Sequence, residues 1–69
     1  MKIETLVGLQ GYTLIVYRGF DYLYRFSIID FSGILYNFDS IFLTAEEANQ
    51  KGREAVELAF DFDLKKHQF

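Results

Sequence analysis

An amphipathic helix over residues 43–60 is the feature of this sequence that most constrains its fold. Thr44 suits the N-cap position, because its hydroxyl can accept the backbone N–H of Glu47 while that carboxylate reaches back to the cap. At 3.6 residues per turn, six small or short side chains share one face: Ala45, Ala48, Gly52, Ala55, Val56 and Ala59. Such a face lets the helix axis lie close to its partner, so the partner has to supply the bulky side chains.

Gly52 lies in the middle of this helix, where glycine costs about 1 kcal/mol relative to alanine. We therefore predict that Gly52 marks the closest approach of the helix to the sheet. We assign residues 44–62 to the helix and residues 63–69 to a tail, into which the helix extends to about Lys66 before it frays. Three cationic or titratable residues there suit the C-terminal end of a helix dipole: Lys65, Lys66 and His67.

Alternating apolar and polar residues upstream of the helix predict an antiparallel β-meander over residues 12–42. β-branched and aromatic side chains dominate its first segment, and the two later segments alternate cleanly. The three predicted strands are residues 12–18, 22–31 and 34–42.

The predicted reversals lie at glycines. Gly19 is expected to take the positive φ of a type II′ turn, and residues 30–33 have the Asp and Gly positions of a type I turn. Residues 1–11 are either an extra strand or a flexible arm. As a strand, this segment would place four residues on one side: Ile3, Thr5, Val7 and Leu9.

One face of the predicted sheet is bulky and matches the small face of the helix. Its aromatic and aliphatic residues in the later strands are Tyr22, Tyr24, Phe26, Ile28, Ile34, Tyr36, Phe38 and Phe42. Both faces of residues 12–18 are apolar, so that either Leu14 and Val16 or their neighbours point inward. We predict an α+β fold: one domain over residues 1–69, with a three-stranded, or four-stranded, antiparallel meander and one C-terminal helix packed on one face.

A single helix covers one face of such a sheet, and the opposite face also carries apolar side chains, a pattern typical of an interface. With Leu14 and Val16 inward, Ile15 lies on this opposite face. Its candidate partner-binding residues are Tyr17, Leu23, Arg25, Ile29, Leu35, Asn37 and Ile41. Three occupants remain open: a second copy of the chain, a different protein, or the chain's own termini. The terminal residues concerned are Leu6, Leu9, Phe62, Leu64 and Phe69.

Composition restricts the classes of function. The chain has no cysteine, which excludes disulfides and thiolate metal sites and predicts the cytoplasm. A net charge of −3 argues against nucleic acid or an anionic membrane as the main partner. The start of the sequence is unlike a signal peptide, and no apolar run approaches the length of a membrane span.

Catalytic residues are scarce. His67 is the only histidine and lies near the end of the sequence, and the aspartates suit turns and helix ends rather than a metal site. The sequence has no Gly-rich phosphate loop and no nucleophile elbow. We therefore predict a non-enzymatic protein without a metal or cofactor.

Residues 18–25 resemble the RNP1 motif of RNA-recognition motifs at five positions: Arg18, Gly19, Phe20, Tyr22 and Leu23. Asp21 and Arg25 depart from that motif. The helix that the family places between its first strands is also missing. A hairpin loop is therefore the better interpretation of this segment.

A second resemblance covers residues 12–60. A three-stranded meander followed by Thr44-x-Glu46-Glu47-Ala48 and by residues 53–58 is similar to HicB-like antitoxin domains and to other small bacterial β-β-β-α proteins. In that family the unit binds and neutralises a small RNase toxin. We predict a small protein-binding or regulatory module that uses the uncovered sheet face or an edge strand, with a toxin-binding antitoxin as the alternative.

Overall fold

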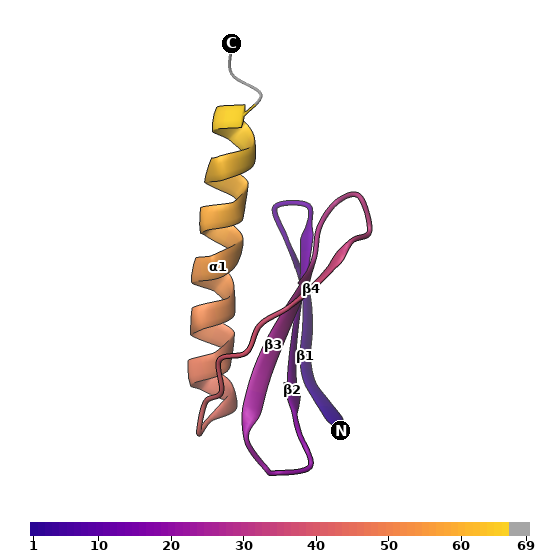
Figure 1. The fold of residues 1–69 in the computed structure, drawn as a ribbon, viewed down its shortest axis with the longest axis vertical. Helices are drawn as coiled ribbons and strands as arrows, with labels where there is room; N and C mark the ends of the chain where they lie inside the picture. Colours follow the sequence, from indigo (N-terminus) through magenta and orange to yellow (C-terminus); the bar gives the residue numbers. More distant parts are fainter. Residues whose placement is uncertain (67–69) are drawn as a thin grey trace.

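The computed structural model describes residues 1–66, which form four strands followed by one helix. These are β1 (Lys2–Leu9), β2 (Tyr12–Arg18), β3 (Tyr24–Ile29), β4 (Leu35–Asn37) and α1 (Ala45–Lys66). The strands make one antiparallel sheet in the order β1-β2-β3-β4, and α1 lies along one face of it (Figure 1). The predicted α+β meander is confirmed, and residues 1–11 supply its fourth strand.

α1 begins as predicted. The Glu47 backbone N–H donates to Thr44 Oγ1 at 3.1 Å, and the Ala48 N–H donates to the Thr44 carbonyl at 3.2 Å. The helix continues to Lys66, the limit expected for its extension into the tail. The predicted fraying and His67 lie outside the described residues.

The small face of α1 packs on the bulky face of β2 and β3. The buried core consists of Tyr12, Leu14, Val16, Phe26, Ile28, Ala48 and Val56. This settles the register of β2, with Leu14 and Val16 inward. A Cβ at Gly52 would collide with the Leu14 side chain, lying 3.1 Å from its Cδ2 and closer still to its Cδ1. Gly52 therefore lies at a close approach of helix and sheet, as predicted.

A β-bulge interrupts β1. Ile3 pairs with Tyr17 whereas Thr5 pairs with Val16, so Glu4 is an extra residue in the ladder. Because cross-strand partners share a face, Ile3 lies on the face away from α1 and Thr5 lies on the face toward it. The prediction that Ile3 shares a face with the rest of its strand is therefore wrong.

The connection from β2 to β3 is a wider loop than the predicted type II′ turn. Tyr22, not Gly19, has the positive φ, at 65°, and β3 begins at Tyr24. The Gly19 N–H donates to the Leu23 carbonyl at 2.9 Å, and the Tyr22 N–H donates to the Gly19 carbonyl at 3.1 Å. The Asp21 carboxylate also accepts the Leu23 N–H at 3.1 Å. This hydrogen bond between a side chain and the backbone two residues away stabilises the wider loop.

β4 is much shorter than predicted. On the β3 side two residues lie between Tyr24 and Ser27, whereas on the other side four residues lie between their partners Phe42 and Asn37. Two extra residues therefore leave the ladder between Asn37 and Phe42, and the predicted strand over residues 34–42 ends early.

Aromatic packing holds residues 38–42 against β3, where the hydrogen-bond ladder is interrupted. The Phe38 and Phe42 rings lie 4.7 and 6.0 Å from the Phe26 ring, centroid to centroid. The turn before β4 has the expected hydrogen bond, from the Gly33 N–H to the Asp30 carbonyl at 2.9 Å.

Gly52→Leu tests the contact between α1 and the sheet. We expect it to lower the free energy of unfolding by about 3 kcal/mol or more, since even a Cβ collides with the fully buried Leu14. Gln50→Leu is the control, because Gln50 is exposed on the same helix. Urea denaturation of both variants measures the difference, and equal midpoints for Gly52→Leu and the wild type would contradict the close contact.

Candidate functional site

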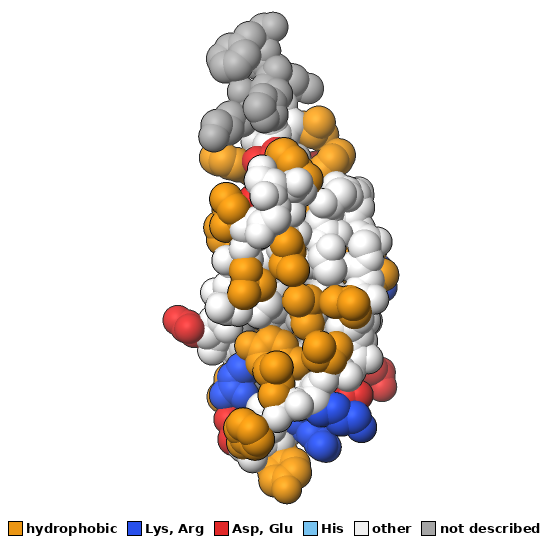
Figure 2. All heavy atoms as spheres, turned by 90° about the vertical axis from the view of Figure 1, so that its right-hand side faces the viewer, with side chains coloured by type: hydrophobic (Ala, Val, Ile, Leu, Met, Phe, Trp, Pro, Cys, Tyr) orange, Lys and Arg blue, Asp and Glu red, His pale blue; other side chains and the backbone are white. Residues whose placement is uncertain are grey.

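The sheet face away from α1 is the candidate functional site, and we call it the outer face. Figure 2 shows hydrophobic side chains gathered on it, with Lys and Arg side chains toward its lower end. Strand register places three rows of residues on this face: Ile3, Tyr17 and Arg25; Leu6, Ile15, Ser27 and Asn37; Thr13, Ile29 and Leu35.

A shallow apolar hollow of about 280 Å³ lies on the outer face. Its lining residues are Met1, Ile3, Ile15, Tyr17, Ser27, Leu35 and Asn37. The hollow brings together Tyr17, Leu35 and Asn37 of the predicted site. Leu35 is 52% exposed, so the hollow is open to a partner.

The polar residues of the hollow satisfy each other. Ser27 is only 4% exposed, although no described element covers this face, because its neighbours in the hollow shield it. The Ser27 hydroxyl donates to Asn37 Oδ1 at 2.6 Å. A partner can therefore cover the centre of the hollow without leaving the buried hydroxyl unpaired.

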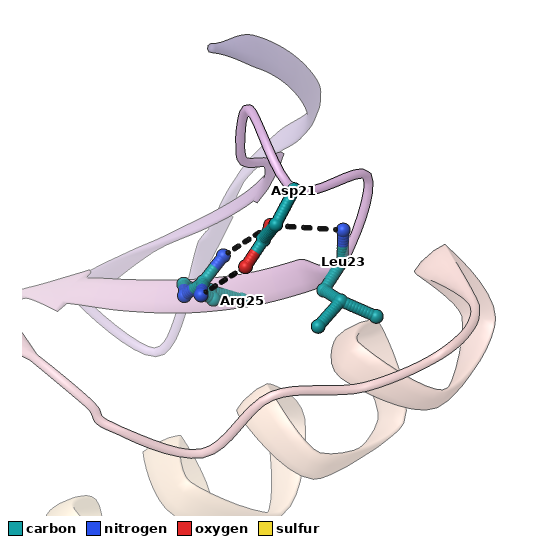
Figure 3. A network of polar contacts seen from close by, with 3 residues as sticks. All are labelled: Asp21, Leu23 and Arg25. Atoms are coloured by element: carbon teal, nitrogen blue, oxygen red, sulfur yellow. Dashed lines mark hydrogen bonds and ion pairs between the residues drawn. The ribbon is translucent and has the colours of Figure 1, made fainter.

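The other predicted site residues lie outside the hollow. Ile29 is half-buried in the row of Leu35, and Ile41 lies on the segment between β4 and α1, outside the strands. Leu23 precedes β3, and its side chain extends away from Asp21 and Arg25 (Figure 3). These three residues therefore do not line the hollow, although the strand alternation predicts one continuous surface.

Arg25 is engaged by Asp21 in a bidentate ion pair (Figure 3). Its Nη2 lies 2.7 Å from Asp21 Oδ2, and its Nη1 lies 3.0 Å from Asp21 Oδ1. The hydrogen bonds from Arg25 and from the Leu23 N–H lower the pKa of Asp21 to about 2, and the same pair raises the pKa of Arg25. Arg25 thus braces the β2–β3 loop at the edge of the outer face.

Sequence reasoning missed Met1 and Ile3 as part of this surface. Ile3 reaches it only because Glu4 is bulged out of the ladder, and the bulge depends on the pairing of β1 with β2. The predicted covering of this face by the N-terminal segment is not found, because β1 pairs into the sheet. Leu9 is half-buried against the core, and Leu6 is exposed. Phe62 and Leu64 lie on α1, across the sheet, and Phe69 lies outside the described residues.

A second hollow, of about 370 Å³, lies between the sheet and the C-terminal half of α1. The Tyr12 hydroxyl donates to Asp63 Oδ2 within it, and the Tyr36 hydroxyl donates to Asp30 Oδ2 at 3.3 Å. Burial and the bond to Asp63 raise the pKa of Tyr12 to about 12. The Asp30 charge, with burial, raises the pKa of Tyr36. The Tyr12–Asp63 bond ties the last turns of α1 to the start of β2.

Three further findings concern function. Residues 1–66 contain no group of three or more His, Cys, Asp or Glu side chains placed to hold a metal ion. Within that same range, no helix has both the length and the apolar character needed to cross a membrane. No family model, curated protein or solved structure matches the chain.

The raised pKa of the Tyr12 hydroxyl makes the free energy of unfolding depend on pH. Because its pKa is raised from 10 to about 12 on folding, this contribution is fully present below pH 10 and is lost as the pH rises toward 12. We expect the difference in melting temperature between the wild type and Tyr12→Phe to be constant up to pH 9.5 and to shrink above it. Tyr22→Phe, at an exposed tyrosine, is the control. A difference that stays constant to pH 11.5 would contradict the raised pKa.

Proposed function

We propose that this chain is a small, non-enzymatic protein-binding or regulatory module, acting in the cytoplasm, whose binding surface is the outer face. The observation that carries the proposal is the open apolar hollow around Ile3, Ile15 and Leu35, on the side of the sheet that α1 leaves uncovered. Contiguous exposed apolar surface of this kind marks protein interfaces.

The sheet edges are less suited to pairing with a partner strand. β4 offers only three residues, and β1 carries both the bulge at Glu4 and the charge of Lys2. Short edges, bulges and edge charges are features that block strand addition. These features favour the outer face over an edge as the binding surface.

The dimensions of the outer face favour a weak or transient complex. At about 4.8 Å per strand and about 3.4 Å per residue, four strands and the seven residues of β2 span about 19 by 24 Å, or about 450 Å² of flat area. A standard interface buries about 800 Å² per partner. Self-association through this face alone is therefore expected to be weak, and a tight partner would also have to contact the rim.

Substitutions in the hollow test this proposal. Leu35→Lys and Ile3→Lys put a charge at exposed positions of the outer face, whereas Leu58→Lys is the matched control on α1, where Leu58 is 72% exposed. Sedimentation equilibrium is expected to give about the monomer mass of 8.1 kDa at micromolar concentration, with association at higher concentration. We expect that association, or capture of a partner from the source organism, to fall at least tenfold in the first two variants only.

The nature of the captured partner would distinguish the two candidate functions, and the variants test whether the outer face is the binding surface. A small basic partner, lost with Leu35→Lys, would favour the antitoxin that the sequence resemblance predicts, whereas a larger assembly would favour an adaptor. Equal binding and equal self-association by the wild type and both outer-face variants would show that the outer face is not the working surface. Circular dichroism confirms that each variant is folded.

A further inference from the structure

A like-charged pair occupies one end of the sheet. Lys2 on β1 pairs directly with Arg18 on β2. Cations placed opposite each other on neighbouring antiparallel strands repel, and such pairs are destabilising. Neither side chain forms an ion pair with a carboxylate among the residues that the structure describes.

The two cations line one pocket of about 260 Å³, which we call the tip pocket. Its residues are Met1, Lys2, Arg18, Gly19, Phe20 and Tyr22. The aromatic residues are strongly exposed, Phe20 at 91% and Tyr22 at 73%. The Arg18 guanidinium carbon lies 5.3 Å from the centroid of the Tyr22 ring, a cation–π contact. The tip pocket thus combines two positive charges with two accessible rings.

The carboxylate in the loop that lines this pocket is already paired elsewhere. Asp21 lies in the same loop, but both of its oxygens bond to Arg25, and it also accepts the Leu23 N–H. Its charge is therefore matched by Arg25, as Figure 3 shows. Lys2 and Arg18 remain as an excess of positive charge in a chain whose net charge is −3.

The backbone of Tyr22 has an unusual conformation at this pocket. A φ of 65° is uncommon for a bulky residue and is a genuine conformational outlier. In this conformation the Tyr22 ring lies against the Arg18 guanidinium.

We propose that the tip pocket binds an organic oxyanion, that is, a phosphate or carboxylate group attached to an aromatic ring. The oxyanion would lie between the Lys2 ammonium and the Arg18 guanidinium, which are suited to charge-assisted hydrogen bonds. The attached ring would pack on Phe20 and Tyr22. The size of the pocket, slightly below that of typical small-molecule pockets, restricts the ligand to about one ring and one anionic group. This site shares only Met1 with the outer-face hollow, and the charged and aromatic residues that would bind the ligand are not part of that hollow, so the proposal does not rest on the proposed function.

Three matched probes test the site by ¹H–¹⁵N NMR titration of the full chain at low salt. Phenyl phosphate carries both features, inorganic phosphate carries only the charge, and benzyl alcohol carries only the ring. We expect phenyl phosphate to shift the amides of Gly19 and Phe20 and to bind about tenfold more tightly than either partial probe, because benzyl alcohol lacks the charge-assisted hydrogen bonds and inorganic phosphate lacks the ring packing. Phenylacetate shows whether a carboxylate serves as well as a phosphate.

Variants identify the residues responsible. Lys2→Gln and Arg18→Gln are each expected to weaken phenyl phosphate binding at least fivefold. Lys51→Gln removes the same charge from an exposed helix position and is expected to leave binding unchanged. Without ligand, Lys2→Gln is expected to raise the melting temperature, because it removes the repulsion with Arg18. Phenyl phosphate should then raise the melting temperature of the wild type but not that of a double variant that carries both Lys2→Gln and Arg18→Gln.

Some outcomes would overturn the proposal. Equal binding by the wild type and by the double variant would show that the anion binds elsewhere. Equal affinity for phenyl phosphate and benzyl alcohol would show that the charges are not used. The affinity of a short phosphotyrosine peptide shows where the anion comes from. If the peptide binds more tightly than phenyl phosphate, the natural ligand is a modified protein side chain. If the two bind equally, the natural ligand is a free small molecule.

Discussion

The close contact between Gly52 and Leu14 is the constraint on which the rest of the structure depends. Because the helix face has almost no bulk, α1 can lie directly on β2 and β3, and the large side chains of those strands fill the space between the layers. A core built in this way needs only one helix. It also leaves the second face of the sheet without cover from the described chain, and this is where the apolar hollow forms.

The parts of the fold that follow from local patterns could be predicted from the sequence. The Thr44 cap, the small helix face and the inward rows of β3 depend on neighbours within a few residues, and each is confirmed. The bulge at Glu4 could not be predicted in this way. It is set by the pairing of β1 with β2, so a single extra residue moved Ile3 onto the outer face and changed the membership of the site.

Two local predictions failed because side-chain contacts that turn preference and alternation do not include were formed instead. Gly19 suits a tight turn, but Asp21 bonds to both Leu23 and Arg25 and stabilises a wider loop. The alternation of residues 34–42 suits a long strand, but two extra residues leave the ladder between Asn37 and Phe42, and the Phe38 and Phe42 rings pack on Phe26. In both cases side-chain contacts accompany the departure from the predicted backbone. The sequence pattern contained those residues without showing which would meet.

Two departures from local preference lie together at one end of the sheet. The core satisfies its hydrogen bonds and packing, with no unpaired buried side-chain atom in residues 1–66. The like-charged pair of Lys2 and Arg18 and the left-handed Tyr22 instead meet in one pocket. A domain of 69 residues has only about 3–10 kcal/mol of stability, at about 0.05–0.15 kcal/mol per residue, and a left-handed residue costs about 1–2 kcal/mol of it. Two such costs in one exposed pocket are typical of a binding site.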